Sequence, residues 1–398
     1  MTCEEVYEQR YHREPKQAFC PYRVCPLGAH IDHQFGRIHG FALNYGVHMA
    51  YGVKENGVIE LSSMNFPKRA QFHVSYVPDR QNDWADHLRG ATRILAKKYP
   101  LRYGLCGVIK GSLPIGGLSS SAAVIICFLR AICDVNGINL SDRDYIYMAK
   151  QAENEYVGVS CGKLDQSCEV LCRKDSLLYL DCLDDSYKNI GSPAEMPDFK
   201  IAVLFSGLER ALKTSAYNNR VDECRASAFA LYSYAVSDLL TEMDMEVGMK
   251  LDEMYLRKMD RSIFDSYGDR MPLTWRKRCS HFYSEMDRVE KGLSLWEKGD
   301  LAGYGKLVFE SGLSSIVNYE SGCPELKKLY EIMTGTDGVY GGRFSGAGFK
   351  GCCMALIDPS FSDSIKEKIE KEYLEEFPNL RGKYSFHLCG TADGVGGK

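Results

Sequence analysis

Residues 113–123 read Leu-Pro-Ile-Gly-Gly-Leu-Ser-Ser-Ser-Ala-Ala, so two glycines and three hydroxyls stand directly before an apolar run. The run predicts a buried helix from Ser121 to Ala131, because Arg130 is its one charged residue. A helix N-terminus presents unpaired N–H groups and about half a positive charge, so a glycine- and serine-rich loop that opens into it suits a polyphosphate. The alternative is an ordinary core helix with a serine N-cap. This stretch alone leaves both interpretations open.

Length and composition restrict the class of protein. At 398 residues the chain exceeds a typical single hydrophobic core, which favours two domains. The nearly balanced charge, −4 overall, makes a nucleic-acid partner unexpected. The 16 cysteines form no Cys-x-x-Cys pair and lie in apolar runs, as reduced cysteines do. Because Met1–Glu5 does not begin a signal segment and no apolar stretch approaches the ~20 residues of a membrane span, we expect a cytoplasmic protein without a membrane partner.

Strand-like and helix-like segments alternate along the chain. Strands are expected at Ala42–Val53, Val58–Ser63, Leu105–Ile109, Leu177–Leu180, Ile201–Phe205 and Cys352–Ile357. Helices are expected at Trp84–Leu95, from Ser141 to about Tyr156, from Lys163 onward, at Asn219–Leu239 and at Trp275–Trp296. The polar residues 184–198 predict a boundary between an N-terminal domain, residues 1–192, and a C-terminal domain, residues 193–398. A second glycine-rich loop, Arg343–Gly351, lies in the C-terminal half, so the two loops suggest a cleft.

The segment Arg23–His33 places a cation, an acid and two imidazoles around a turn. His30 and His33 do not predict a zinc site, because no third ligand stands at a usual spacing, and a structural role is favoured for both. Asp32 is a short acid in a turn near glycine, which suits it to accept hydrogen bonds from hydroxyls. The alternative for Asp32 is an Asx-turn bond to its own backbone.

Two later segments hold further candidates. Asp165 follows Gly162 by three residues and is the best candidate for a general base. Its alternative role is to stabilise the helix that begins there. Tyr217 and Arg220 could likewise belong to a helix start with a solvated charge.

Taken in order, these segments resemble those of the GHMP kinases and, within them, the galactokinase branch. Residues 23–33 are similar to the galactokinase signature, a Gly-Arg-Val-Asn-Leu-Ile-Gly-Glu-His-Thr-Asp-Tyr type of segment. The other similar segments are the phosphate loop at 117–122, the stretch with the catalytic Asp at 153–166, the Tyr-Asn-x-Arg segment at 217–224, a further galactokinase block at 319–326 and the third GHMP motif at 342–352. The resemblance implies an α+β GHMP kinase fold, with an N-terminal domain like domain 2 of ribosomal protein S5, a ferredoxin-like C-terminal domain and an active site between them.

The resemblance also implies a role for each matching residue. Asp165 would take the proton of the anomeric hydroxyl, and Arg23 would stabilise the nucleophile and the transferred phosphoryl group. The sugar pocket would be formed by Ala29, His30, Asp32, Gly162 and Tyr217. The ATP phosphates would be bound by Gly116, Gly117, Leu118, Ser119, Ser120, Ser121, Gly346 and Gly348. Ser121 and Glu153 would bind Mg²⁺, since hydroxyl and carboxylate oxygens suit that cation.

One departure from the galactokinases concerns the sugar. Ala29 stands where they carry a Glu that contacts the primary 6-hydroxyl. A carboxylate ~4 Å from a substrate carboxylate would cost about 4 kcal/mol at an effective dielectric near 20, so an alanine here favours a sugar oxidised at C6. Residues 21–34, with Tyr22 and His33 at changed positions, are similar to those of the galacturonokinases of plants. Ser311–Ile316 and Arg343–Phe349 are similar to them as well.

Two further departures concern the phosphate loop and the base. The loop Pro114–Leu118 is one residue shorter than in typical galactokinases, and Lys163 stands where they carry an apolar residue. Lys163 could neutralise a substrate carboxylate, but a solvated lysine beside the site is favoured. His33, Arg210 and Lys213 are rival partners for that carboxylate.

The sequence therefore predicts an ATP- and Mg²⁺-dependent sugar 1-kinase with a small sugar or sugar acid as its substrate. D-galacturonate is the preferred acceptor, and a galactokinase with an altered C6 pocket is the first alternative. A sensor that binds sugar and ATP without catalysis is the alternative from another class. Monomer and dimer stay open.

Overall fold

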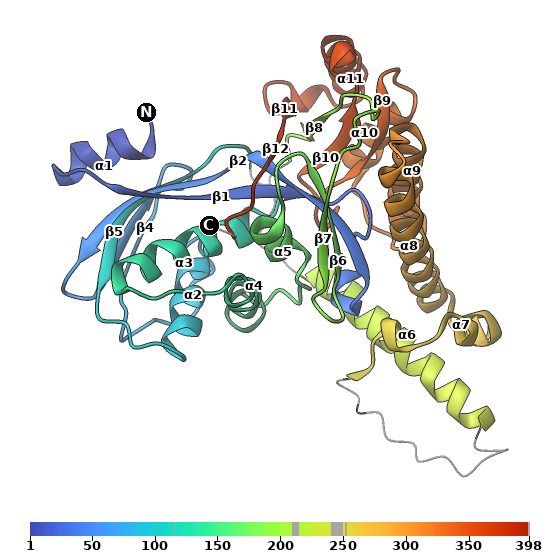
Figure 1. The fold of residues 1–398 in the computed structure, drawn as a ribbon, viewed down its shortest axis with the longest axis horizontal. Coiled ribbons are helices and arrows are strands. Elements are labelled where there is room, and N and C mark those ends of the chain that lie inside the picture. The colour runs from blue at the N-terminus through green and yellow to red at the C-terminus, as the bar shows by residue number, and fades with distance from the viewer. Residues whose placement is uncertain (115, 209–214, 240–249, 251–252, 397–398) are drawn as a thin grey trace.

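The computed structural model describes the chain except for residues 115, 209–214, 240–249, 251–252 and 397–398 (Figure 1). The described strands form two sheets. The larger has the order β4-β3-β5-β2-β6-β7, with β1 and β12 also paired to β2, and the smaller has the order β11-β8-β10-β9. The strands of the larger sheet are β1 (Lys16–Val24), β2 (Arg37–Lys54), β3 (Val58–Ser63), β4 (Arg69–His73), β5 (Gly104–Gly111), β6 (Ser176–Asp181), β7 (Tyr187–Gly191) and β12 (Thr391–Ala392).

The long strand β2 is the axis of the larger sheet. Its first residues pair with β6 and its second half pairs with β5, while β1 runs antiparallel along it. Alternate side chains of β2 pack into two different hydrophobic cores: Val47 and Met49 face the core that includes α3 (Ser120–Asn136), and Ala50 faces the core that includes α1 (Cys3–Tyr11). This period of two buries both faces of the sheet.

Helices cover both faces of that sheet. α3 (Ser120–Asn136) is mostly apolar and buried over most of its length, and it packs on β1, β2 and β5. In Figure 1, α2, α3 and α4 lie on the side of the sheet opposite α1. The helices of this part are α1 (Cys3–Tyr11), α2 (Asp86–Ala96), α4 (Asp142–Gln151) and α5 (Leu164–Leu171), with a π-helix at Ala152–Val157 and a 3-10 turn at Asp32–Gln34. α3 is thus a rigid support for the loop that precedes it.

The smaller sheet joins the two halves of the protein. Its strands are β8 (Lys200–Phe205), β9 (Val339–Phe344), β10 (Cys352–Ile357) and β11 (Ser385–Cys389). Ala202 and Leu204 of β8 face a core with the helices α10 (Pro324–Thr334) and α11 (Ser362–Glu376), whereas Ile201 and Val203 face the core of the larger sheet. The proposed division at residue 192 therefore crosses a continuous hydrophobic core.

Four further helices form an arm beside the sheets (Figure 1). They are α6 (Ser215–Leu239), α7 (Arg261–Tyr267), α8 (Leu273–Glu297) and α9 (Leu301–Val317). Short 3-10 turns lie between these helices at Leu256–Lys258 and Gly268–Arg270, and two more flank α11 at Pro359–Phe361 and Pro378–Leu380. α8 packs on both α6 and α9, and its Trp296 packs against Phe41 of β2. One end of the arm thus lies against the larger sheet.

The strands expected from the sequence are confirmed, since each lies within β2, β3, β5, β6, β8 or β10. The capped helix start is also confirmed, because Ser141 and Asp144 form a capping box. The single helix expected from Ser141 to Tyr156 is wrong in detail, because α4 ends at Gln151 and a π-helix follows it. In the described part of the chain, no helix is both long and apolar enough to cross a membrane.

Candidate active site

The loop before α3 has an unusual backbone. Gly116 and Gly117 have φ angles of +138° and +86°, and Ser119 has a φ of +62°. Ser119 stands at the N-cap position, yet its side chain bonds no helix N–H, and its Oγ is buried without a partner among the described residues. A serine that capped this helix would bond the N–H of the second or third helical residue. The geometry therefore favours the phosphate loop over the ordinary capped core helix.

Arg23 connects this loop to the predicted base. A bulge in β1 between Pro21 and Arg23 shifts the register with β2, and bulges of this kind redirect a side chain. The buried guanidinium donates from Nε to Asp165 Oδ1 at 2.7 Å, and from Nη1 to the Gly117 carbonyl at 3.0 Å and to Ser345 Oγ at 3.3 Å. Burial opposes its charge, but the neighbouring Asp165 raises the pKa of Arg23 above its ordinary value. One cation thus joins the phosphate loop, the second glycine-rich loop and the predicted base.

The second glycine-rich loop packs directly on the first. A Cβ at Gly346 would lie 3.0 Å from the Cα of Gly117, and one at Gly351 would lie 2.5 Å from the carbonyl carbon of Gly116. Both positions also have a positive φ. Gly348 has a different reason to be glycine, because a Cβ there would lie 2.4 Å from the ring of Phe344. The two backbones therefore approach as closely as glycine allows.

A cavity of about 280 Å³ opens beside these loops. It is lined by most of the residues that the sequence assigns to the sugar and to catalysis: Arg23, Ala29, His30, Asp32, Asp165 and Tyr217. Gly117, Ser119, Ser121, Glu153 and Gly346 line it as well. Leu118 does not line it; its carbonyl instead accepts a hydrogen bond from the backbone N–H of Arg23. We call this space the sugar cavity.

Asp32 lines the sugar cavity and lies against Gly162, which is not itself part of the cavity lining. Asp32 is buried and its Oδ2 accepts a hydrogen bond from the N–H of Leu164 at 3.1 Å. A Cβ at residue 162 would lie 2.2 Å from the same oxygen, so only glycine leaves room for the carboxylate. Burial and the nearby Asp165 raise the pKa of Asp32 to about 6. The carboxylate is therefore ionised at neutral pH and free to accept sugar hydroxyls.

The two histidines of the signature segment differ in their surroundings. His33 is fully bonded: Nε2 lies 3.1 Å from the hydroxyl of Tyr319 and Nδ1 lies 3.0 Å from Nε2 of Gln34. His30 stacks on the ring of Tyr319, and its Nε2 has no partner among the described residues. Burial lowers the pKa of both, to about 3 for His33. His33 is thus a structural residue, whereas neutral His30 lines the sugar cavity and has a buried ring nitrogen without a partner among the described residues.

Ser121 and Glu153 lie where two cavities meet, since both residues line the sugar cavity and a second cavity, which is also lined by Phe66 and Trp84. Glu153 belongs to the π-helix, a conformation frequent at functional sites, and accepts a hydrogen bond from Gln166 Nε2 at 2.5 Å. The described residues form no cluster of three His, Cys, Asp or Glu around a metal position. Mg²⁺ commonly binds one or two protein oxygens together with substrate phosphates, so a hydroxyl and a carboxylate fit that mode.

Comparison with known proteins identifies the family. The model of the N-terminal domain of GHMP kinases matches residues 86–173, and that of the C-terminal domain matches residues 292–375. The chain is 34% identical to a galacturonokinase of Arabidopsis thaliana, over 96% of this chain and 93% of the relative. This chain belongs to the GHMP kinase family.

Further relatives place the chain within that family. It is 28% identical to a galactokinase of Clostridium perfringens, over 99% of this chain and 98% of the relative. The structure of Lactococcus lactis galactokinase complexed with galactose superposes with a TM-score of 0.84 at 26% identity, covering 98% of this chain and 97% of that one. The chain is therefore an ATP-dependent sugar kinase of the galactokinase and galacturonokinase type.

A second cavity, of about 360 Å³, adjoins the phosphate loop from the other side. Gly116, Gly117, Ser119, Ser120 and Ser121 line it together with the aromatic residues Phe66 and Trp84. These two rings are nearly parallel, with an interplanar angle of 6°. The sequence pattern predicts only that Trp84 belongs to a helix, and it does not single out Phe66. Their contact depends on tertiary structure, so no local pattern reports it.

The structure also corrects the account of the basic residues. Lys163 is not solvated: it is 5% exposed and forms an ion pair with Asp185 over the ring of Tyr147. His33 is neutral and fully bonded, so it brings no positive charge. Arg210 and Lys213 lie outside the described residues. Within the described part of the chain, the basic side chains that line the sugar cavity are Arg23 and Lys350.

Proposed function

We propose that this GHMP kinase transfers the γ-phosphoryl group of ATP to the anomeric hydroxyl of D-galacturonate, giving galacturonate 1-phosphate and ADP. The likeness to a galacturonokinase along nearly the whole chain supports the proposal. The observation that carries it is Ala29, a small apolar side chain on the wall of the sugar cavity.

Ala29 matters because this cavity is already acidic. Asp32, Glu153 and Asp165 line it. A further carboxylate at position 29, ~4 Å from a substrate carboxylate, would cost about 4 kcal/mol, or roughly a thousandfold in affinity. An alanine removes that repulsion and leaves space for the oxidised C6 group.

The bonding around Asp165 supports its role as the base. Asp165 accepts the proton of the anomeric hydroxyl, the freed oxygen forms the new O–P bond, and the bond from the γ-phosphorus to the leaving ADP oxygen breaks. Arg23, already bonded to Asp165, neutralises negative charge that develops beside the phosphate loop. Ser121 and Glu153 would hold Mg²⁺, which would further neutralise the charge of the phosphates.

Asp32 and His30 orient the sugar in this proposal. The Asp32 carboxylate accepts hydroxyl hydrogen bonds, and His30, whose Nε2 has no partner among the described residues, lines the same cavity. Tyr217 on α6 also lines the cavity, with its ring edge-on to the ring of His33. Together they hold the anomeric hydroxyl near Asp165, and such positioning is most of what phosphoryl transfer requires.

Steady-state kinetics with ADP as the readout test the proposal. We expect a higher kcat/KM with galacturonate than with galactose at saturating MgATP. A preference for galactose would instead support a galactokinase with an altered C6 pocket, which the likeness to bacterial galactokinases also allows. Binding of both ligands without ADP formation would support a sensor.

A further inference from the structure

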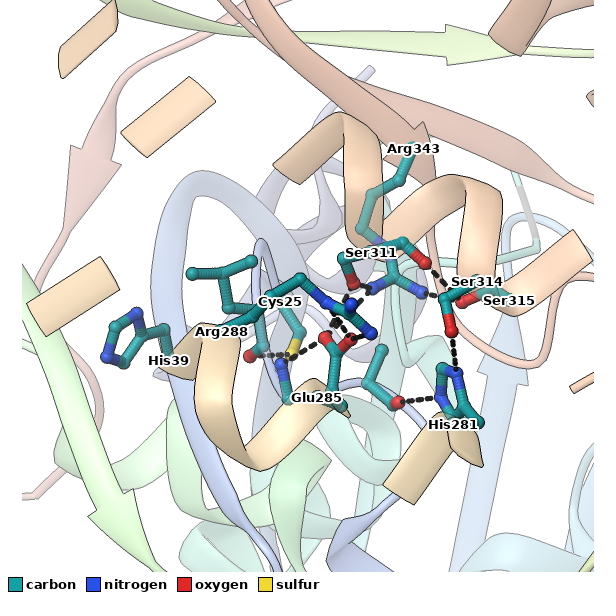
Figure 2. Close-up of polar contacts among 12 residues, drawn as sticks. Cys25, His39, His281, Glu285, Arg288, Ser311, Ser314, Ser315 and Arg343 are labelled. Atoms are coloured by element: carbon teal, nitrogen blue, oxygen red, sulfur yellow. Dashed lines mark hydrogen bonds and ion pairs between the residues drawn. The ribbon is translucent and has the colours of Figure 1, made fainter. Parts of the chain in front are cut away.

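A buried network of polar side chains lies next to the turn Gly28–Asp32, which the proposed function assigns to sugar binding. None of the side chains of this network lines the sugar cavity. Its centre is Glu285 of α8, which has no exposed side-chain surface. In Figure 2 the Glu285 carboxylate faces the guanidinium groups of Arg288 and Arg343. Ser311 of α9 donates to Glu285 Oε1 at 2.5 Å. The network therefore joins α8, α9 and β9.

This network forms hydrogen bonds to the backbone of the turn at two residues, Gly28 and Ala29. The N–H of Gly28 donates to Glu285 Oε1 at 2.7 Å. His281, one helical turn before Glu285, lies with Nε2 3.0 Å from the carbonyl oxygen of Ala29. Both polar groups of the Gly28–Ala29 segment that face α8 are thus bonded to side chains of that helix.

The protonation states at both contacts are defined. Burial lowers the pKa of His281 to about 4, so its ring is neutral at pH 7. A carbonyl oxygen only accepts, so the proton must be on Nε2 and Nδ1 must accept from the Ser314 hydroxyl at 2.9 Å. Burial alone would raise the pKa of Glu285, but the neighbouring Arg288, together with Arg343 and the Ser311 hydroxyl, holds it below its ordinary value. Ser314 thereby fixes the tautomer that holds Ala29.

The turn needs such support because its conformation is strained. Gly28 has a φ of +87°, and a Cβ there would lie 2.4 Å from the carbonyl oxygen of Arg37. His30 has a φ of +67°, a region that a side chain other than glycine occupies only when its surroundings impose it. Two hydrogen bonds from α8, directly before His30, impose it here.

We propose that His281 and Glu285 are positioning residues that set the placement of Ala29, His30 and Asp32 for sugar binding, through hydrogen bonds to the backbone of Gly28 and Ala29. This inference rests on the proposed sugar kinase activity. It also assigns a purpose to Ser311, Ser314 and Ser315, which belong to a segment that resembles the galacturonokinases. Ser311 and Ser315 both accept hydrogen bonds from Arg343, so the same network reaches the strand before the second glycine-rich loop.

The test compares three variants by steady-state kinetics and thermal unfolding. His281→Leu removes the donor to Ala29, and we expect the sugar KM to rise about tenfold while kcat and the ATP KM change less than about threefold. His281→Gln retains an N–H at the ε position and should restore most of the sugar affinity. His39→Leu is the matched control, because His39 is equally buried and its ring bonds Tyr304 instead of the turn. It should lower the melting temperature to a similar extent and leave the sugar KM unchanged.

If His281→Leu fails to fold, Ser314→Ala tests the same hydrogen bond with little loss of side-chain volume. Without the Ser314 hydroxyl, the His281 ring is no longer held in the tautomer that donates to Ala29, so the sugar KM should again rise. An unchanged sugar KM in these variants, or an equal rise with His39→Leu, would overturn the positioning role. A wild-type enzyme that prefers galactose would contradict only the galacturonate assignment, since the turn is held in the same way for either sugar. Binding of neither sugar to the wild-type protein would overturn both proposals.

Discussion

Asp32 shows at the scale of one residue how a binding site is maintained at the expense of stability. Its pKa of about 6 in the folded protein exceeds the ordinary value of 3.8, so the folded state binds the proton more tightly than the unfolded chain. Ionisation therefore destabilises the fold as the pH rises from about 4 through 6, by up to about 3 kcal/mol. The cost is absent below that range and complete above it.

Asp32→Asn tests this account. We expect the variant to unfold at a higher denaturant concentration than the wild type at pH 8, and at a similar concentration at pH 4. Sugar affinity should fall at least tenfold at pH 8, because the amide no longer offers a charged acceptor to hydroxyls. Equal stability of the two proteins at pH 8 would show that the buried carboxylate carries no such cost.

In the proposed reaction, Asp165 is the residue that accepts the proton. Asp165→Asn preserves size but cannot take a proton, so we expect kcat to fall by a factor of about 10² to 10⁴. Sugar and ATP binding, measured by calorimetry, should stay within about threefold of the wild type. Near-normal turnover in this variant would exclude Asp165 as the base.

At the scale of an element, the first turn of α3 distinguishes a binding hydroxyl from a structural one. The buried Ser119 Oγ has no partner in the described structure, whereas Ser141 caps α4 through a capping box. Ser119→Ala should raise the ATP KM roughly tenfold without loss of stability. Ser141→Ala should lower stability by about 1 kcal/mol and leave the ATP KM unchanged. The same response in both variants would contradict a phosphate contact for Ser119.

The elements also show where prediction from sequence succeeds. The strand β10 and the loop before α3 were predicted because composition and spacing within about ten residues specify them. The π-helix at Ala152–Val157 was missed, since its pattern continues that of α4. Lys163 was misjudged because its partner Asp185 lies on a distant segment. The support from Glu285 to Gly28 was not foreseen for the same reason.

At the scale of the whole molecule, residues 391–396 connect the smaller sheet to α5, the helix of the predicted base Asp165. β12 pairs with β2. The N–H groups of Val395 and Gly396 donate to carbonyls in the last turn of α5, and Gly394 N–H donates to the carbonyl of Cys172 directly after it. These bonds satisfy carbonyls that would otherwise lack partners at the helix end. Residues 394–396 therefore stabilise α5 from the end opposite Asp165.

Deletion of residues 391–398 tests that connection. We expect the melting temperature and kcat to fall together, because α5 loses its C-terminal partners, while the ATP KM changes little. Circular dichroism should confirm that the shortened protein keeps its helices. Full activity and an unchanged melting temperature would show that α5 is stable without the tail.

The proposed preference for galacturonate rests on the absence of an acid at position 29, on the wall of the sugar cavity. The most direct measurement is the ratio of kcat/KM for galacturonate to that for galactose, in the wild type and in Ala29→Glu. We predict a ratio above one for the wild type and a fall of about a thousandfold in the variant, nearly all of it from the lost reaction with galacturonate. A wild-type ratio below one, or an equal loss with both sugars in the variant, would contradict the account.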